Sequence, residues 1–368
     1  MSSVAPATKG YPKDIHACPT ELLTVDLTGK VIIVTGGYSG IGYNVIKQLL
    51  SQKASIVIAG RNEAKGSATV ENLKKETGVM EGIEFMLLDL VDFESVKAFV
   101  VAFKSKYSNT LDVLVNNAAV QLPKMQRTSS GKDVMMVTNH LGHVLLTELL
   151  LDTLKATSGS RIVHVSSVAA SQMDNSQKYV ADVDLSDPHW ESKKFMEWEC
   201  YGGTKFAQVL YSEELAKRLE GTGVKSVAIH PGWAPTPLFR NQSCIILCCI
   251  FPVCGPSMGI LKIDAASQVH LFTILSPDIE TGKFYSQKGI YMQKNLKAGA
   301  MPFTNESMEE FNPNNTAEKR AAVYEWSLKE CGLQGGAPVG TVSDSGVETM
   351  AMTRTAPGGM PNDVEGGL

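Results

Sequence analysis

The chain has 368 residues, of which 43% are hydrophobic and 20% are charged, so it can build the core of one large domain or of two. Its formal net charge is −4 and its lysines and arginines form no dense run, which argues against a nucleic-acid-binding surface. The seven cysteines are an odd number without a regular spacing, which favours a reducing compartment and a cytoplasmic location.

The N-terminal region, residues 1–28, contains scattered proline, glycine and threonine without periodicity, and it predicts a flexible arm. It lacks the uninterrupted apolar core of a signal peptide, and no arginine precedes Arg61, which disfavours a transit peptide. The longest apolar run, Ile245–Val253, is too short to cross a bilayer as a helix. We therefore expect neither secretion nor a membrane-spanning segment.

Four of the cysteines cluster around that apolar run. They form no Cys-x-x-Cys pair and no histidine stands near them, so their spacing is not that of a zinc site. We expect an apolar segment and no metal, and the sequence leaves peripheral membrane contact through residues 244–254 open. The four residues are Cys244, Cys248, Cys249 and Cys254.

The first strong structural signal is a strand followed by a glycine-rich turn. The β-branched run Val31–Val34 predicts a strand buried on both faces of a parallel sheet, and a helical spacing of apolar residues begins after the turn. Glycines at such a turn let the backbone approach a phosphate, and the first helical N–H groups face the anion. The stretch predicts a dinucleotide-binding loop, with a tight turn that binds nothing as the alternative. The expected contacts are Gly36, Tyr38, Ser39, Gly40 and Ile41, with Gly42 completing the spacing.

A second predicted strand, Ser55–Ala59, completes a βαβ unit, and the residues after it bear on the choice of cofactor. An NAD site places a carboxylate at this strand end, whereas an NADP site places an arginine near the 2′-phosphate. No acid stands here and Arg61 follows at once, so the sequence favours NADP(H) over NAD(H). The alternative is a surface arginine at the start of a helix.

Two further strands are predicted at 83–88 and 111–115, and both end in residues suited to a ligand. Asp89 can accept a hydrogen bond from an adenine amino group or cap the next helix, Phe93–Phe103, and we leave both roles open. Leu90 follows it. Asn116 and Ala118 come after the next strand, where small side chains and amides let a flat ring or a ribose lie close.

Tyr201 and Lys205 stand four residues apart and share one face of a predicted helix. A phenol has a pKa of about 10, and an ammonium one turn away favours the phenolate, so this pair can exchange a proton with a substrate. The same spacing occurs at Tyr43 and Lys47, directly after the glycine loop. No serine-bearing strand precedes that second pair, and we expect Lys47 to face solvent.

These motifs resemble the short-chain dehydrogenase/reductase family. The resemblance rests on TGGYSGIG at 35–42, NNAA at 116–119 and the Tyr201–Lys205 pair, and it covers about residues 28–290. NHLGH at 139–143 is similar to the retinol-dehydrogenase-like branch and also to the light-dependent protochlorophyllide reductases. The family implies a Rossmann fold and hydride transfer between NAD(P)(H) and a carbonyl or alcohol.

The resemblance also implies roles for single residues. Asn139 would hold a water that links Lys205 to solvent. Ser167, the second serine of the pair 166–167, would hold the substrate oxygen, with Ser166 as its competitor. Residues of the HPGWAPT turn would contact the nicotinamide carboxamide, and these are Pro231, Gly232 and Thr236. Lys205 would also hold the nicotinamide ribose, whereas we expect His140 and His143 to be packing residues.

Two segments depart from the family pattern. The insert within 170–200 is long and rich in aromatic residues, and we expect it to cover the pocket together with the apolar segment 238–262. A partner-binding surface is the alternative for the insert. Residues 333–368 are rich in glycine, proline and serine and predict a disordered tail. Before this tail a last helix is expected at 317–328, docking through Ala321, Ala322 and Trp326.

In sum, we expect a single doubly wound α/β domain over residues 29–332 with a mainly parallel sheet. The expected activity is that of an NADP(H)-dependent carbonyl reductase or alcohol dehydrogenase for a bulky apolar small molecule. A non-catalytic NADP(H)-binding scaffold is the alternative, and light-dependent reduction of protochlorophyllide is a minor one. The sequence does not indicate an oligomeric state.

Overall fold

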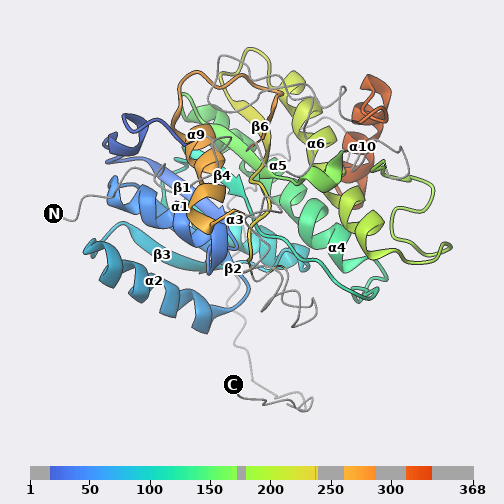
Figure 1. Ribbon diagram of the computed structural model, residues 1–368, viewed down its shortest axis with the longest axis horizontal. Coiled ribbons are helices and arrows are strands. Elements are labelled where there is room, and N and C mark those ends of the chain that lie inside the picture. Colours follow the sequence, from blue (N-terminus) through green and yellow to red (C-terminus); the bar gives the residue numbers. More distant parts are fainter. Residues whose placement is uncertain (1–16, 172–179, 237, 239–260, 287–311, 334–368) are drawn as a thin grey trace, which may run out of the picture. The chain divides into compact units, whose positions relative to one another are not determined.

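In the described part of the chain, seven parallel strands form one sheet in the order β3-β2-β1-β4-β5-β6-β7 (Figure 1). The computed structural model describes residues 17–171, 180–236, 238, 261–286 and 312–333. The strands are β1 Val31–Thr35, β2 Ser55–Gly60, β3 Ile83–Leu87, β4 Val113–Asn116, β5 Arg161–Val165, β6 Lys225–His230 and β7 Phe284–Ser286. This topology confirms the doubly wound α/β fold expected from the continuous apolar runs, and β7 is a strand that the sequence did not reveal.

Helices cover both faces of the sheet. One apolar core lies between the sheet and α3, α5, α6 and α10, and a second lies between the sheet and α1, α2 and α9. The longer helices are α1 Gly40–Ser51, α2 Glu63–Thr77, α3 Phe93–Lys106, α5 Gly142–Ala156, α6 Glu197–Arg218, α9 Gln268–Leu275 and α10 Ala317–Glu330. The short ones are η1 Leu22–Thr24, α4 Val134–Met136, η2 Val137–Leu141, η3 Val168–Ala170 and α8 Ile263–Ala266.

The position of β1 creates the place where a ligand can bind. β1 lies between β2 and β4, so the connections after β1 and after β4 leave the sheet in opposite directions. Thr35 is in register with Ala59, and Val34 with Val115, which brings the turns after these strands side by side. Ligands of open α/β sheets bind in the crevice that such a reversal opens at the carboxyl ends of the strands.

The helix predicted near the C-terminus exists as α10, and it packs along α6 (Figure 1). Its buried side chains are Val323, Tyr324, Ser327 and Leu328, and the Tyr324 ring stacks on Tyr211 at 5.3 Å. The predicted docking residues were therefore mostly wrong. Ala322 is exposed and Ala321 is half-buried, because the face that meets the core begins at the next residue, while Trp326 does pack against the core at its edge.

The described part of the N-terminal arm, residues 17–28, belongs to the core. Cys18 and Leu27 are buried, and the Cys18 amide donates to Gln268 Oε1 at 3.1 Å. The segment Val134–Ala156 is long and apolar enough to span a membrane by length and composition, yet 72% of its most apolar window is buried inside the fold. Of the predicted tail, the structure describes Leu333 alone, and that side chain packs against the core.

Candidate active site

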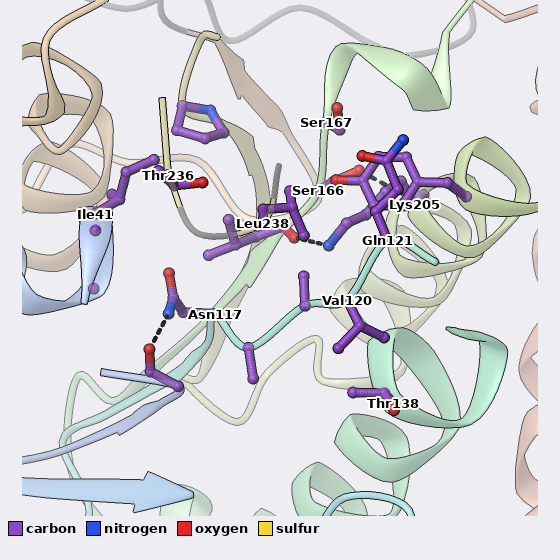
Figure 2. A pocket seen from close by; sticks show the side chains of 18 of the residues that line it. Ile41, Asn117, Val120, Gln121, Thr138, Ser166, Ser167, Lys205, Thr236 and Leu238 are labelled. Carbon is purple, nitrogen blue, oxygen red and sulfur yellow. Dashed lines mark hydrogen bonds between the residues drawn. The ribbon is translucent and has the colours of Figure 1, made fainter. Parts of the chain in front are cut away.

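A cavity of about 550 Å³ lies at the carboxyl ends of the strands. Figure 2 shows Ile41 and Thr236 on one side of it and Ser167, Gln121 and Lys205 on the other. The structure brings together nearly all of the predicted site residues, although they come from positions 36 to 236 of the chain. The predicted residues that line the cavity are Gly36, Tyr38, Ser39, Gly40, Ile41, Arg61, Asp89, Leu90, Ala118, Ser166, Ser167, Tyr201, Lys205, Pro231, Gly232 and Thr236.

The glycine loop presents an uncapped helix terminus to this cavity. Ser39 is the N-cap of α1, and its side chain makes no capping hydrogen bond, whereas Asn62 caps α2 by accepting from the Lys65 amide. The first N–H groups of α1 thus remain available to an anion. Gly36 has φ +67°, and a Cβ on it would lie 2.9 Å from the Ala118 Cα. The loop therefore requires glycine where it closes against the turn after β4.

The two asparagines after β4 have different places. Asn117 lines the cavity, and its Nδ2 donates to the Thr35 carbonyl at 2.8 Å, which joins the turns after β1 and β4. The prediction that Asn116 contacts the cofactor was wrong. Its side chain is fully buried on the other side of the strand and donates to Thr147 Oγ1 at 2.9 Å, because successive side chains of a strand point to opposite faces.

Arg61 is exposed at the rim of the cavity, directly after β2. Within the described part of the chain, it forms no ion pair with a carboxylate. Tyr38 supports the turn that carries Arg61, since its hydroxyl accepts from the Asn62 amide at 2.9 Å. The arginine is thus held beside the glycine loop, with its charge available to an anionic ligand.

Asp89 also lines the cavity, and the helix-capping role left open for it is wrong. Asp92 caps α3 by accepting from the Glu94 amide, while Asp89 Oδ1 accepts from the Val91 amide within its own turn. The remaining role for Asp89, as an acceptor for an adenine amino group, stays a prediction. Its neighbour Leu90 is buried and lines the same cavity.

The two serines after β5 make different hydrogen bonds. Ser166 is buried, and its hydroxyl donates to the Lys205 carbonyl at 2.7 Å, which fixes α6 against the end of β5. Ser167 caps η3 through the Ala169 amide at 3.2 Å and also hydrogen-bonds with Tyr201. This arrangement favours Ser167 over Ser166 as the serine that meets a substrate oxygen.

Tyr201 and Lys205 lie on one face of α6, with the Lys205 Nζ 5.8 Å from the centre of the Tyr201 ring. Burial raises the pKa of Tyr201 above its usual value of 10, while the hydrogen bond with Ser167 acts in the opposite direction. Burial also lowers the pKa of Lys205 to about 7. The expectation that Lys205 makes this phenol acidic is therefore corrected for the protein without ligand, because burial penalises the charged form of both groups.

Asn139 lies in the π-helical turn η2 and does not line the cavity among the described residues. Its Oδ1 accepts from the Val120 amide at 2.8 Å, and its Nδ2 donates to the Val120 carbonyl and to Thr204 Oγ1, both at 3.0 Å. The side chain thus ties the loop after β4 to α6, close to Tyr201. The water-holding role inferred from the family resemblance stays a prediction.

The far end of the cavity is largely apolar. Trp198 lines it from the first turn of α6, with its ring edge-on to Tyr201 at 6.3 Å. Trp190 and Phe195 of the insert pack beside Tyr201 and Leu238 in one cluster. Arg127 anchors the insert by donating to the Trp190 carbonyl at 2.9 Å. Of the described residues in 170–200, Trp198 alone lines the cavity, so the covering role expected for the insert stays a prediction, and residues 172–179 and 239–260 lie outside the described part.

Sequence reasoning missed several cavity residues. Val120 and Gln121 follow the NNAA motif, Trp233 stands inside HPGWAPT, and Trp198 precedes Tyr201 by three residues. Their closeness to recognised motifs is the only sequence signal that could have found them. The further additions are Ala59, Gly60, Leu88, Val91, Ala119, Thr138, Val165, Val168, Ala169, His230 and Ala234.

The other polar groups that the sequence singled out are structural. Lys47 and Tyr43 both contact Glu76 on the surface, with the Lys47 Nζ 2.6 Å from its carboxylate, so this second Tyr–Lys pair is not part of the site. His140 and His143 are buried packing residues, as predicted. Among the residues that the structure describes, no three potential metal ligands come together, and the predictions for cysteines 244–254 lie outside those residues.

A dinucleotide fits these residues on two observations: the uncapped start of α1 and the Gly36 cradle, which any side chain would fill. The cavity also lies within the usual size range of ligand sites. Together with a tyrosine, a lysine and a serine at its other end, the fold and site define the class of dinucleotide-binding oxidoreductases.

Comparisons with known proteins agree with this class. A family model described as short chain dehydrogenase matches residues 30–181. An uncharacterized oxidoreductase of Schizosaccharomyces pombe is 42% identical over 221 residues, which are 58% of this chain and 63% of that protein. Human retinol dehydrogenase 12 is 34% identical over 262 residues, which are 71% of this chain and 79% of that protein. The chain belongs to the short-chain dehydrogenase/reductase family and is retinol-dehydrogenase-like.

Solved structures show the same fold. An uncharacterized protein from Mycobacterium Paratuberculosis has a TM-score of 0.62 at 24% identity, with 84% of this chain and 96% of that chain covered. The Pseudomonas aeruginosa RhlG/NADP complex has a TM-score of 0.57 at 22% identity, with 72% and 97% covered. At these identities the likeness concerns the fold.

Proposed function

We propose that this protein is an NADP(H)-dependent carbonyl reductase or alcohol dehydrogenase that acts on a bulky apolar substrate. The observation that carries the proposal is the meeting of Ser167, Tyr201 and Lys205 at one end of a cavity whose other end is the glycine loop. A protein that only bound a nucleotide would not need a serine, a phenol and an amine converging beside it. The proposal extends the family's oxidoreductase class to a cofactor and a kind of substrate.

The preference for NADP(H) rests on Arg61. A 2′-phosphate carries charge that a guanidinium can bind through two hydrogen bonds, and Arg61 stands free of carboxylates among the described residues, at the end of β2. The residues that would hold the rest of the dinucleotide are the α1 terminus for the pyrophosphate, Asp89 for the adenine, and Lys205 for the nicotinamide ribose.

When bound, the nicotinamide would supply or accept the hydride. The protein's part is to hold the substrate and move the proton. Ser167 can donate a hydrogen bond to the substrate oxygen, and Tyr201 carries its proton at neutral pH, since a phenol has a pKa of about 10 and burial raises the pKa of Tyr201 further. A protonated phenol is the form that a carbonyl oxygen requires during reduction. In the reverse direction, the alcohol proton would pass to Tyr201 after this phenol has lost its own.

The lining of the far end supports an apolar substrate. Trp198, Val168 and Leu238 surround the space next to Tyr201, with Gln121 as a polar group at its edge. A long-chain or ring-bearing aldehyde, ketone or alcohol matches this lining better than a sugar does. The name of human retinol dehydrogenase 12 points to an alcohol of that kind, and we include retinol and retinal among the substrates to test.

The direct experiment is a substrate screen in which turnover is monitored through the absorbance of the reduced cofactor at its characteristic wavelength. Purified protein with NADPH is offered apolar aldehydes and ketones, and with NADP⁺ the corresponding alcohols. Turnover of apolar substrates that disappears in Tyr201→Phe supports the proposal. Silence over the whole panel, together with tight NADPH binding, would favour the non-catalytic scaffold. Adding protochlorophyllide in light and in darkness tests the minor alternative from the sequence.

We further propose a cytoplasmic, reducing location. The described cysteines Cys18, Cys200 and Cys331 are free and buried, which supports it. Peripheral membrane contact through residues 244–254 lies outside the described residues and stays a prediction.

A further inference from the structure

The ammonium group of Lys205 is held by two acceptors inside the protein. Its Nζ donates to the Val165 carbonyl at 2.8 Å and to Gln208 Oε1 at 3.0 Å. A lysine ammonium has three N–H donors and no acceptor. Since these two contacts use two donors and Lys205 lines the cavity, the third N–H is left for the cavity. The two acceptors thus determine how the lysine faces a ligand.

Gln208 lies one turn after Lys205 on the same face of α6, and it is buried with 1% of its surface exposed. Its carbonyl oxygen must face the ammonium, because the amide nitrogen would meet donor with donor. Its Nε2 is buried without a hydrogen-bond partner among the described residues. A buried amide with one unpaired end is unfavourable for folding, so its contact with Lys205 is what makes a glutamine useful here.

No carboxylate among the described residues comes within ion-pair distance of Lys205. Five buried titratable groups on α6 and on neighbouring elements are neutral at pH 7, since burial raises the pKa of Tyr201 and lowers that of the histidines. They are Tyr201 on α6, His140 on η2, His143 on α5, His164 on β5 and His230 on β6. Several carboxylates on the elements around α6 bond elsewhere: Asp133 before α4 with Cys200, Glu148 on α5 with Tyr211 and Tyr324, Glu213 with Arg320, Glu214 and Glu325 with Arg218, and Glu330 with Lys132.

We propose that Gln208 is a positioning residue for Lys205, whose carbonyl oxygen keeps the amine protonated and directs its third N–H into the cavity. The consequence for catalysis rests on the proposed function. Burial and the two acceptors act on Lys205 in opposite directions: burial disfavours the ammonium, and each acceptor favours it. Removing the Gln208 acceptor leaves the Val165 carbonyl alone against burial.

Two substitutions change this acceptor in opposite directions. Gln208→Met keeps most of the side-chain volume and removes the oxygen, so it lowers the pKa of Lys205 by about 1, the size expected for one hydrogen bond to a charged group. Gln208→Glu keeps an oxygen at the same reach and adds negative charge, so it raises the pKa. Gln48 is a partly buried glutamine of α1 that donates to the Leu23 carbonyl. The matched control is Gln48→Met, which should leave the pKa of Lys205 unchanged.

The experiment follows the Lys205 Nζ resonance by NMR through a pH titration of the ligand-free protein labelled with ¹⁵N-lysine, with the signal assigned by Lys205→Met. The proposal is supported if the pKa of Lys205 changes in opposite directions in Gln208→Met and Gln208→Glu. It is overturned if this pKa is unchanged in both folded variants, or if it changes in the same direction in both. Thermal unfolding of each variant reports whether it folds. If Gln208→Met does not fold, the change in the pKa of Lys205 in Gln208→Glu decides whether the proposal stands.

The proposed function adds a second readout. If a substrate is known, the high-pH decline of kcat/KM moves to lower pH in Gln208→Met and to higher pH in Gln208→Glu, because the protonated lysine is the working form. A purely structural role for Gln208 would lower activity at every pH without moving this decline, and that result would overturn the proposal. If the pKa of Lys205 changes in opposite directions in the two variants but the protein turns over no substrate, the role of Gln208 toward Lys205 stands and the proposed function is wrong.

Discussion

Lys205 and Tyr201 share one face of α6, and the lysine nitrogen lies 5.8 Å from the centre of the phenol ring. Both side chains are buried, and burial raises the pKa of the phenol while it lowers that of the amine to about 7. In the ligand-free protein, burial therefore favours the neutral form of both groups, while the two acceptors on the Lys205 Nζ favour its ammonium form. This state is prepared for donating a proton to a carbonyl oxygen.

The first prediction concerns Tyr201→Phe, which removes the proton donor and keeps the ring. Turnover should fall by about 10²–10⁴-fold, the usual contribution of a general acid. The dissociation constant of NADPH, measured by fluorescence quenching, should change little because the ring still fills its place. Tyr43→Phe provides the control, since Tyr43 contacts Glu76 at the surface. An equal loss of turnover and of NADPH binding in Tyr201→Phe would indicate a structural role.

The second prediction concerns Arg61→Asp. Replacing the guanidinium by a carboxylate should weaken NADPH binding by roughly 10–100-fold, as expected for losing a charged hydrogen bond, and should favour NADH. The measurement is the ratio of kcat/KM for the two cofactors. Lys75→Asp makes the same change in net charge on an exposed residue of α2 and should leave the ratio unchanged. NADPH preference that survives in Arg61→Asp would refute the charge argument.

The third prediction compares Gly36→Ala with Gly29→Ala. Both glycines have positive φ, at +67° and +81°, but a Cβ at 36 would lie 2.9 Å from the Ala118 Cα, whereas a Cβ at 29 meets nothing within 4 Å. Gly29→Ala should lower the free energy of unfolding by about 1 kcal/mol through backbone strain, and Gly36→Ala by about 3 kcal/mol through strain and crowding. Urea denaturation measures this difference.

The same pair of variants tests the nucleotide site. In Gly36→Ala, the loop that closes on the turn after β4 has to shift. The loss in the free energy of NADPH binding should therefore be at least as large as the loss in the free energy of unfolding. Gly29→Ala lies before β1 and should bind NADPH with the affinity of the unaltered protein. Equal NADPH affinity in the two variants would argue that the glycine loop does not hold the cofactor.

The fourth prediction concerns stability in acid. Burial lowers the pKa of His140, His143 and His164 to about 3 in the folded protein, against about 6.5 in an unfolded chain. Below pH 6.5 the unfolded chain therefore binds protons that the folded protein refuses. The contribution of these neutral histidines to the free energy of unfolding is fully present above pH 6.5 and is lost as the pH falls from there toward 3.

Each of these histidines should cost about 1 kcal/mol of stability between pH 7.5 and pH 5.5. Urea denaturation at the two pH values measures the total loss. His140→Gln removes one titrating group and should reduce the difference between the two pH values by about 1 kcal/mol. A free energy of unfolding that does not change over this range would contradict the burial of neutral histidines.

Much of the fold could be predicted from the sequence because its signals are local. Val31–Val34 and Ser55–Ala59 are continuous apolar runs, and such runs form strands covered on both faces whatever lies around them. The glycine loop and the Tyr201–Lys205 spacing are likewise properties of a few consecutive residues. These motifs indicated the fold class, the family and many of the residues that line the cavity.

Other features depend on contacts between distant parts of the chain. Asn116 is the last residue of β4 and Asn117 follows it directly, and the contact of Asn116 with Thr147 of α5 takes its side chain out of the cavity. Ser166 is distinguished from Ser167 by a hydrogen bond to Lys205, 39 residues further on. The docking face of α10 depends on Tyr211 and the rest of α6, which the helix's own residues do not reveal.

The sequence by itself determined the order of the first six strands and of the helices between them, and the presence of a phenol and an amine one helical turn apart, since repeating apolar patterns and fixed spacings act over a few residues. Only the tertiary structure decided which asparagine and which serine face the cavity, which glutamine supports Lys205, and in which direction the pKa values of Tyr201 and Lys205 move. Those outcomes follow from burial and from partners far along the chain, and both arise only when the elements pack together.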